Sequence, residues 1–345
     1  MRSIKTLKKN LRDIPGKRIL KRLFDSKPLH CSMYITDKCN YSCGYCFEYD
    51  NTKPHPTLAE IKQRIDKVAE LGVMKLALAG GEPLLHPEIT RIIRHAKSKR
   101  MNVSLSTNGA LLDAPMLAKL DSAGLDVIQI SIDRKKPTNV TQKALDNLTI
   151  TADELIKTRI KVHISGVVCQ ANEDEIEEVL TYGLKNDIPT ELRLIHGDLS
   201  GRNKIPSISK KKGFHLINTQ IRLKQSGLHV HSSRMLLNYQ KNRILGKKQE
   251  WKCLAGYKVF FVSAEGYFWP CSLLKTKRKI EDMKMADLKQ YNVMKECQPQ
   301  CGIYCAVSHS LFMQHPFLFV FGEIPSKVSQ SMRMFHKVSR SQNQP

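Results

Sequence analysis

Two hydrophobic patterns alternate along the central part of the chain. From His30 onward, short runs rich in aliphatic and β-branched residues are each followed by a stretch whose apolar residues recur every three or four positions. Because six strand-like runs alternate strictly with six helix-like stretches, the sequence predicts an α/β fold: a parallel sheet closed into a partial (β/α)6 barrel of the TIM type. The strand-like runs are HCSMYIT, VMKLALAG, MNVSLST, DVIQISID, IKVHISGVV and TELRLIHG, and the helix-like stretches are 57–71, 89–98, 114–123, 142–157, 174–185 and 210–226.

The pattern changes beyond about Leu228. The strand-like run VFFVSAEGYFWP lies between cysteines, and the cysteine-dense segment ECQPQCGIYC follows it. A segment with so little apolar material of its own is typical of a small domain that is organised by bound metal. We therefore predict four parts: a basic amphipathic N-terminal segment (1–29), the barrel (30–227), the small metal-organised domain (228–310) and a C-terminal tail (311–345).

Composition narrows the class of protein. Of the 345 residues, 41% are hydrophobic, which is usual for a soluble globular protein. No apolar run reaches the roughly 18 to 20 residues that a membrane-spanning helix requires. The N-terminus lacks the apolar core of a secretion signal, so we expect a cytoplasmic protein. In that reducing compartment, the ten cysteines are expected to be metal ligands rather than disulfide partners.

The net charge of +24 raises the question of a nucleic-acid partner. The basic residues are spread over the N-terminal segment, 202–252 and 275–279 without the aromatic signature of RNA-binding proteins, so we do not expect such a partner. The N-terminal segment has helical apolar periodicity and suits either an anionic membrane surface or packing on the barrel. The apolar tail 311–324 is too short to span a bilayer and is interrupted by Pro316; we favour a final core element, with peripheral membrane contact as the alternative.

Three thiols, those of Cys39, Cys43 and Cys46, lie within eight residues just after the first predicted strand. A structural zinc site needs four ligands, and no fourth cysteine or histidine lies close by in the sequence. Three cysteines on one tight loop can instead hold three irons of a [4Fe-4S] cluster and leave the fourth iron open. An open iron is a place where a substrate or cofactor binds.

The Cys-x3-Cys-x2-Cys spacing, with Tyr45 just before the last cysteine, resembles the signature of the radical S-adenosylmethionine (SAM) enzymes, which implies that Tyr45 is one of the cofactor-binding residues. The turn Gly80-Gly81-Glu82-Pro83 is similar to the family's GGEP turn, which meets the amino group of SAM. Other residues that follow the predicted strands match the family's cofactor-binding positions, and the resemblance covers roughly residues 30 to 200. Ser106, Asn108, Ser131 and Asp133 match positions that contact the ribose and methionine parts, and Gly166 and Asn172 resemble the segment beneath the adenine.

The resemblance continues in the cysteine-rich part. Cys253, Gly266 and Cys271 have the spacing that opens the SPASM and twitch extensions of this family, which carry auxiliary [4Fe-4S] clusters. The segment lacks a CxxC pair, and no cysteine follows Cys305, so its five thiols are too few for two fully ligated clusters. We therefore expect one auxiliary cluster with Cys253 and Cys271 as ligands. Which two of Cys297, Cys301 and Cys305 complete it is left open, and the fifth thiol is then a spare or a catalytic group.

The resemblance implies a reaction. An electron, delivered by a reductant such as flavodoxin or ferredoxin, would cleave SAM at the cluster to methionine and a 5′-deoxyadenosyl radical, which would abstract hydrogen from an unactivated carbon. The expected substrate is a peptide, a natural product or other small molecule, or a lipid-linked compound, and no catalytic side chain is assigned. The alternative is a non-catalytic iron–sulfur protein that transfers electrons or uses metal to stabilise a binding surface.

The remaining candidates are assigned structural roles. Cys31 and Cys169 lie inside apolar strands and are expected in the core. The histidines show no ligand spacing, and a satisfied structural role is favoured for them over substrate contact. The same holds for the two charged residues near the sixth strand. These side chains are those of His86, His163, His196, Arg193 and Asp198.

Overall fold

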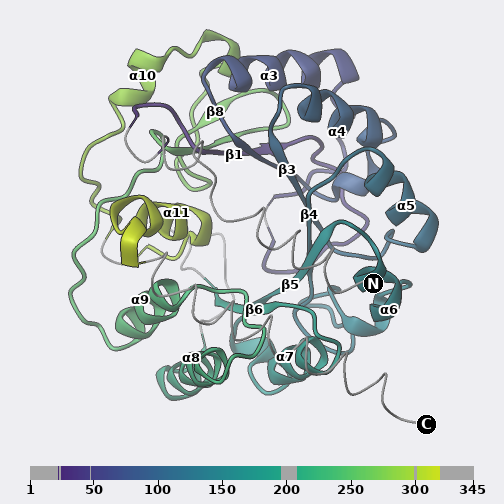
Figure 1. Cartoon of the computed structure of the whole chain (residues 1–345), viewed down its shortest axis with the longest axis vertical. Helices are drawn as coiled ribbons and strands as arrows, with labels where there is room; N and C mark the ends of the chain where they lie inside the picture. The colour runs from purple at the N-terminus through teal and green to yellow at the C-terminus, as the bar shows by residue number, and fades with distance from the viewer. Residues whose placement is uncertain (1–21, 23–24, 47, 196–207, 299–300, 319–345) are drawn as a thin grey trace.

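A single twisted sheet organises the molecule, in a computed structural model that describes residues 22, 25–46, 48–195, 208–298 and 301–318 (Figure 1). The sheet has eight strands in the order β6-β5-β4-β3-β2-β1-β7-β8. Neighbouring strands from β6 to β7 are parallel, and only β8 runs antiparallel to its neighbour β7. The strands are β1 (His30–Tyr34), β2 (Lys75–Ala79), β3 (Asn102–Thr107), β4 (Val127–Ser131), β5 (Lys161–Val168), β6 (Thr190–Leu194), β7 (Val259–Val262) and β8 (Phe268–Trp269).

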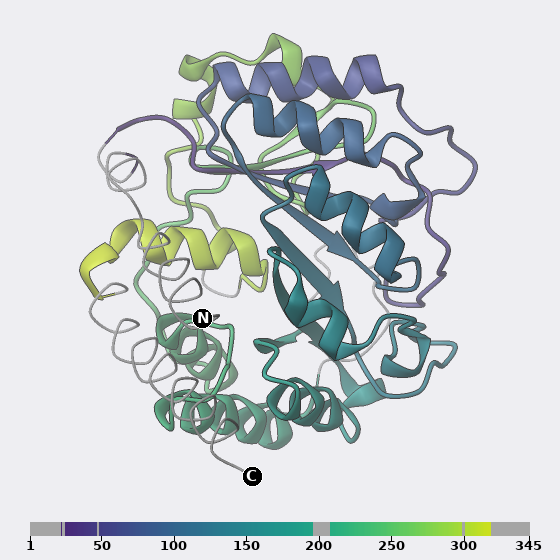
Figure 2. The ribbon, with the colours of Figure 1, turned by 45° about the vertical axis from the view of Figure 1, so that its right-hand side comes forward.

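Helices follow the strands in turn and cover the outer face of the sheet (Figure 2). The alternation of β1 to β6 with helices confirms the predicted partial barrel. Capping residues fix the first turn of several helices. The Thr57 hydroxyl, for example, accepts a hydrogen bond from the N–H of Glu60, and the Glu60 carboxylate accepts one from the N–H of Thr57. The helices are α3 (Leu58–Glu70), α4 (Ile89–Ser98), α5 (Ala114–Ser122), α6 (Ala152–Lys157), α7 (Ile176–Lys185), α8 (Lys210–Gln225), α9 (Arg234–Ile244), α10 (Met285–Lys289) and α11 (Tyr304–Gln314).

One predicted helix is wrong. The stretch 142–157 forms an irregular segment, a single 3-10 turn at Leu145–Asn147 and the short helix α6. The polar groups before α6 are used in long-range contacts instead. The carbonyl of Val140 accepts from the N–H of Gly44, and the side chain of Gln142 accepts from the N–H of Ser42. Tertiary bonds to the thiol loop therefore override the local helical pattern.

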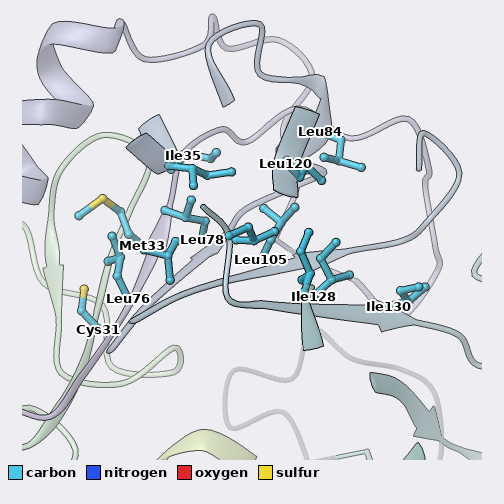
Figure 3. Close-up of a cluster of buried hydrophobic side chains, with 14 of the residues drawn as sticks. Cys31, Met33, Ile35, Leu76, Leu78, Leu84, Leu105, Leu120, Ile128 and Ile130 are labelled. Carbon is cyan, nitrogen blue, oxygen red and sulfur yellow. The ribbon is translucent and has the colours of Figure 1, made fainter. Parts of the chain in front are cut away.

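The core lies between the sheet and its outer helices. Successive side chains of a strand point to opposite faces, so Cys31 and Met33 of β1 point outward, where they join Ile61 and Ile65 of α3 in one buried cluster. Figure 3 shows the strand residues of this cluster gathered on one side of the ribbon. Each such buried aliphatic side chain contributes about 1.5 to 3 kcal/mol. The opposite face of every strand is thereby left for the barrel interior.

The cysteine-rich part is joined to this sheet. Strand β7 pairs with β1 in parallel, from His30 opposite Val259 to Met33 opposite Val262. Helix α11 packs against α9 and β7 (Figure 2). The sheet is thus continuous across the predicted boundary at residue 228, and the division into domains stays a prediction.

The two ends of the chain lie mostly outside the described residues. This applies to the predicted N-terminal amphipathic segment, of which residues 22 and 25–29 are described, and to the tail beyond residue 318. Leu311, the first tail residue, belongs to α11 and is buried in the core. Among the described residues, no helix has both the length and the apolar character needed to cross a bilayer.

A very close backbone contact connects β1 to β2 beyond their ends. The N–H of Gly81 donates to the carbonyl of Thr36 at 2.9 Å, and the N–H of Glu82 donates to that of Lys38 at 2.7 Å. A Cβ atom at Gly80 would lie 2.1 Å from the Thr36 oxygen, and one at Gly81 would lie 2.2 Å from the Lys38 oxygen. Only glycine therefore permits this approach.

We predict that Gly81→Ala destabilises the fold by about 1 to 3 kcal/mol, because backbone atoms cannot yield to the added methyl group as a side chain could. Gly44→Ala is the matched control: a Cβ there would lie 3.7 Å from its nearest neighbour, and neither glycine has a positive φ. The midpoint of urea unfolding measures the difference. Equal midpoints for the two variants would show that the contact is not a structural constraint.

Candidate functional site

The thiol loop begins where β1 ends and is held by hydrogen bonds from its neighbours. The N–H of Cys39 donates to the side chain of Asn51 at 2.8 Å. The Asn108 amide, at the end of β3, donates to the Asn40 side chain at 2.8 Å. Cys43 is buried, whereas Cys39 and Cys46 are partly exposed. The loop is thus fixed at both sides while two of its thiols remain accessible.

Backbone donors point at two of these sulfur atoms. The N–H of Tyr41 lies 3.4 Å from Sγ of Cys39, and the N–H of Gln142 lies 3.3 Å from Sγ of Cys43. Hydrogen bonds to the sulfurs are among the features by which proteins tune thiolate-bound iron–sulfur clusters. The donor set of the loop therefore fits a cluster held by three thiolates.

Lys143, which the sequence analysis missed, supplies the positive charge of this site. Its ammonium group lies 5.2 Å from the centroid of the Tyr45 ring. Burial alone would lower the pKa of Lys143, but the charges of Tyr45, Asp133 and the neighbouring thiols raise it well above its usual value. A lysine that stays charged beside several sulfur atoms would stabilise their thiolate forms. No spacing in the sequence connects this lysine to the thiols, because a long irregular loop brings it there.

Asp133 holds the thiol loop against the sheet. The Tyr45 hydroxyl donates a short hydrogen bond to Oδ2 of Asp133, which also accepts from Oγ1 of Thr141 at 2.8 Å. The other oxygen, Oδ1, accepts from the N–H of Val167 on β5 at 2.8 Å. The side chain is 1% exposed. Asp133 and Tyr45, both predicted to bind SAM, are therefore bonded to each other and connect β4, β5 and the thiol loop.

Glu82 has a similar position on the other side of the loop. Its carboxylate accepts from the N–H of Leu84 at 3.0 Å, from Oγ1 of Thr107 at 2.7 Å and from the N–H of Asn108 at 2.7 Å. Burial raises the pKa of Glu82, and these donors oppose that effect. With only 1% of the residue exposed, the carboxylate connects the turn after β2 to the end of β3.

The other predicted SAM contacts have different surroundings. Ser106 and Ser131 lie on the inner faces of β3 and β4, and within the described residues their hydroxyls form no hydrogen bond, so both can receive a ligand. Pro83 is buried in the first turn after Glu82. Gly166 allows a close approach, since a Cβ there would lie 2.6 Å from the carbonyl oxygen of Ile132.

Several residues with structural predictions can be assigned. Cys31 and Cys169 are buried, as predicted. His86 bonds to the carbonyl of Pro56 and the N–H of Glu88, which is the satisfied structural role favoured for it. His196 and Asp198 lie outside the described residues.

A second group of thiols lies in the cysteine-rich part. Burial and then the charges of Cys253, Cys271 and Cys297 raise the pKa of the Cys301 thiol to about 12, so these four thiols are close enough for the charge of one to act on another. Lys295 donates to the carbonyl of Cys253 at 2.9 Å, and its charge acts on the Cys253 thiol. This group therefore has one partly buried lysine beside it, as the thiol loop does.

Cys305 packs against the same buried cluster as Cys253, Cys271 and Cys301, but a different set of charges acts on its thiol. Burial and then the charge of Cys271 raise the pKa of this thiol to about 12, whereas the charge of Arg193, on the inner face of β6, opposes them. The charge of Cys305 also contributes, after burial, to the raised pKa of Tyr34 on the inner face of β1. Cys305 is therefore the thiol of this part on which the charge of Arg193 acts.

A polar network that the sequence did not reveal lies inside the barrel. Glu191 is fully buried, and its carboxylate accepts short hydrogen bonds from Arg193 and from the hydroxyl of Tyr304, and one of 3.2 Å from Ser232. Burial would raise the pKa of Glu191, but Arg193 and two histidines lower it to about 2. The network attaches the first turn of α11 to the barrel wall.

The two histidines beside Glu191 have the composition of a metal site but not its geometry. His163, Glu191 and His231 form the one group of at least three such side chains, in the described part of the chain, whose ligand atoms all lie within 4.8 Å of one another. The imidazole rings of His163 and His231 are stacked in parallel, with centroids 3.9 Å apart and planes inclined by 1°. A ring nitrogen binds an ion in its own plane at about 2.0 to 2.1 Å. Two such stacked rings cannot both face one ion.

This arrangement defines a class of protein: a partial parallel barrel whose first two loops present three thiols and a Gly-Gly-Glu-Pro turn for an iron–sulfur cluster and its ligand. Residues 33–183 match the family described as the radical SAM superfamily. The match covers less than half of the chain, and over these residues it supports SAM and one [4Fe-4S] cluster as cofactors.

Proteins of similar sequence are named for different activities. The chain is 34% identical over 187 residues to a GTP 3′,8-cyclase of Lactiplantibacillus plantarum. The match covers 49% of this chain and 55% of that protein. It is 32% identical over 158 residues to an S-adenosylmethionine-dependent nucleotide dehydratase of Selenomonas ruminantium. This match covers 42% of this chain and 58% of that protein. The chain thus spans only about half the length of the curated relatives it matches.

Solved structures share the fold over most of the chain. One is described as native anSMEcpe with bound AdoMet; it has a TM-score of 0.58 and 18% identity, and the match covers 89% of this chain and all of that one. Another is SuiB of Streptococcus suis, with a TM-score of 0.59 and 17% identity, covering 85% of this chain and 70% of that one. Both likenesses cover a larger share of the chain than the family match over residues 33–183 does.

We predict that Asp133→Ala lowers the free energy of unfolding by about 3 kcal/mol, because it leaves one buried and two partly buried donors without an acceptor. It should also lower the amount of iron that the thiol loop retains, since Tyr45 loses its anchor. Urea unfolding and iron analysis after anaerobic reconstitution measure the two effects. The matched control is Asp146→Ala, at an exposed position of the same region. An Asp133→Ala variant with the stability and iron content of this control would contradict the prediction.

Proposed function

We propose that this chain is a radical SAM enzyme that cleaves SAM reductively and abstracts hydrogen from a carbon of its substrate. One observation carries the proposal: the glycine turn after β2 is hydrogen-bonded directly to the start of the three-thiol loop after β1. A cluster bound by the loop would supply one electron to break a carbon–sulfur bond of SAM, and a one-electron reductant such as flavodoxin or ferredoxin would replace it.

The side chains have distinct tasks in this proposal. Cys39, Cys43 and Cys46 hold the cluster, and Lys143 offsets its negative charge. Ser106 and Ser131 offer the hydroxyls that can hydrogen-bond SAM. Glu82 and Asp133 keep the two loops in place, because nearly all of their acceptor positions are already used. Such a preorganised site orients SAM without further ordering of the protein.

The substrate that these features favour is a small anionic molecule of the nucleotide class. The inner faces of the strands carry three basic side chains, those of Lys75, Lys161 and Arg193, but only one carboxylate, Glu191, which is already paired with Arg193. Burial lowers the pKa of His30 and of His163 on the same faces, so these imidazoles add no positive charge. An excess of positive charge attracts an anion. Two relatives are named for GTP and for nucleotides, which supports this class.

Other substrates receive less support. SuiB has also been solved with a precursor peptide, but its likeness to this chain is one of fold alone. A peptide, another natural product or a lipid-linked substrate therefore stays an expectation from the sequence, as do a cytoplasmic location and peripheral membrane contact. The non-catalytic alternative, an electron carrier, gives no purpose to the open hydroxyls of Ser106 and Ser131.

We further propose that Cys253, Cys271, Cys297 and Cys301 hold one auxiliary [4Fe-4S] cluster. Their thiols are mutual electrostatic neighbours, and Lys295 is beside them. The fifth thiol, Cys305, has the charge of Arg193 acting on it and is not needed as a ligand. This choice decides between the pairs that the sequence left open.

The central test is anaerobic reconstitution of the wild-type chain and of a variant with Cys39, Cys43 and Cys46 all replaced by alanine. We expect about eight irons in the wild type and about four in the variant, as two cubane clusters and then one would give. With dithionite, only the wild type should form 5′-deoxyadenosine from SAM. A fully iron-loaded wild type that forms none, with GTP, CTP or no added substrate, would contradict the proposed activity; zinc in place of iron would do so as well.

The ligands of the auxiliary cluster are tested in that triple variant. Adding Cys301→Ala should reduce the remaining iron from about four to fewer and abolish the cubane electron paramagnetic resonance signal after reduction. Adding Cys305→Ala is the matched control and should leave both unchanged. Loss of the signal in the Cys305 variant alone would exchange the roles of the two thiols.

A further inference from the structure

Gln129 lies on the inner face of the sheet, in the middle of β4. Its chain neighbours Ile128 and Ile130 are fully buried in the outer core, so Gln129 points to the opposite face, where it is partly exposed. The strand register places Gln129 beside Ser106 of β3, at the spacing of about 4.8 Å between neighbouring strands. Ser131 lies on the same face, two residues further along β4. Gln129 is thus next to both hydroxyls that the proposed function assigns to SAM.

The side-chain oxygen of Gln129 is bonded by residues of the two following strands. Oε1 accepts from Nη2 of Arg193 at 3.0 Å and lies 3.4 Å from Nε2 of His163, which is opposite Gln129 in the register. Burial lowers the pKa of His163, so its ring is neutral and donates through Nε2. An arginine can only donate, which fixes which end of the amide is the oxygen.

Arg193 is itself held in place. It donates a short hydrogen bond to the buried carboxylate of Glu191, and the centre of its guanidinium lies 3.8 Å from the centroid of the Tyr304 ring. Rotating the amide of Gln129 would turn its NH2 group toward this guanidinium, so that donors would face donors. The amide therefore has one orientation before any ligand arrives.

The NH2 group of Gln129 is left for a ligand. Its Nε2 atom makes no hydrogen bond to the described residues, and the side chain is accessible from the inner face. Because the oxygen is occupied, Gln129 can donate to a bound molecule but cannot accept from it. Such a group favours an acceptor atom at that place and disfavours a donor, which would leave both hydrogens unpaired.

We propose that Gln129 contacts the substrate and selects its base, by donating a hydrogen bond to a carbonyl oxygen of that base. The proposal deepens the proposed function and rests on its nucleotide-class substrate. An uncharged amide suits an uncharged carbonyl oxygen, whereas charged donors match phosphate oxygens better. Guanine has acceptors only, O6 and N7, along the edge where adenine carries an amino donor. The contact therefore favours guanine over adenine, and it places the base beside the SAM site at Ser106.

The test is calorimetric titration of the anaerobically reconstituted protein with GTP and, separately, with ATP, at constant ionic strength and without SAM. We expect the wild type to bind GTP at least tenfold more tightly than ATP. Gln129→Leu should lose this preference, because it has no donor. Gln129→Glu should reverse it, because a carboxylate accepts from the amino group of adenine. The ratio of the two affinities is the readout, since both nucleotides carry the same triphosphate and the added charge acts on both alike.

Gln63→Glu is the matched control. It makes the same chemical change at an exposed position of α3, and it should keep the wild-type ratio and affinities. Iron content and thermal unfolding of each variant show whether it is folded and loaded. A merely structural role of Gln129 would weaken both nucleotides together and leave their ratio unchanged.

Several results would overturn the proposal. These are no binding of either nucleotide by the wild type, equal affinity for the two or a preference for ATP, and an unchanged ratio in the two Gln129 variants. A further one comes from a separate titration with SAM: if Gln129→Leu weakens SAM as much as it weakens GTP, Gln129 serves SAM instead.

The outcome is separable from that of the proposed function. Nucleotide binding is measured without SAM, and formation of 5′-deoxyadenosine is measured without a nucleotide. A chain that prefers GTP through Gln129 but never cleaves SAM would keep this contact and lose the enzyme. A chain that cleaves SAM but does not distinguish GTP from ATP would keep the enzyme and lose this contact.

Discussion

The contact between Gly80-Gly81 and the backbone of Thr36–Lys38 is the constraint on which the site depends. It brings the loop after β2 within hydrogen-bonding distance of the loop after β1, so the position of the thiols follows from the pairing of the two strands. A Cβ atom at either glycine would lie only 2.1 or 2.2 Å from a carbonyl oxygen, far inside van der Waals contact. The glycines are therefore needed for the shape of the protein, whatever they do for a ligand.

Residues of the site thus serve the fold as well as a ligand, and this explains how much of the structure could be predicted from the sequence. The strands, most helices and the outward core were predictable, because they follow from local periodicity. The positions of Glu82 and Asp133 after their strands were predictable as well, but their partners were not. Both carboxylates lie at the correct edge of the sheet, yet they bond mainly to Thr107, Asn108 and Tyr45, which connect neighbouring loops. A motif specifies a residue type and leaves its hydrogen-bond partners undetermined.

What the sequence could not show depends on contacts between distant segments. The failed helix at 142–157 and the missed Lys143 have one cause: residues 134–144 fold over the thiol loop and use their polar groups there. The interior network of Glu191, Arg193 and Tyr304 joins residues more than a hundred positions apart. Local pattern has no information about such pairs, since each member alone is an ordinary polar residue of a strand or a helix.

The two thiol groups are joined through β1. This strand ends at Tyr34, whose pKa is raised by burial and then by charges that include Cys46 of the thiol loop and Cys271 and Cys305 of the cysteine-rich part. Its ring packs edge-on against Trp269, with centroids 5.7 Å apart. Because β7 pairs with β1 in register, the cysteines around β7 and β8 are fixed relative to the thiol loop by the sheet itself. A substrate in the barrel would therefore lie between two sites whose separation is set by main-chain hydrogen bonds, and side-chain changes inside the barrel could alter what is bound without moving either site.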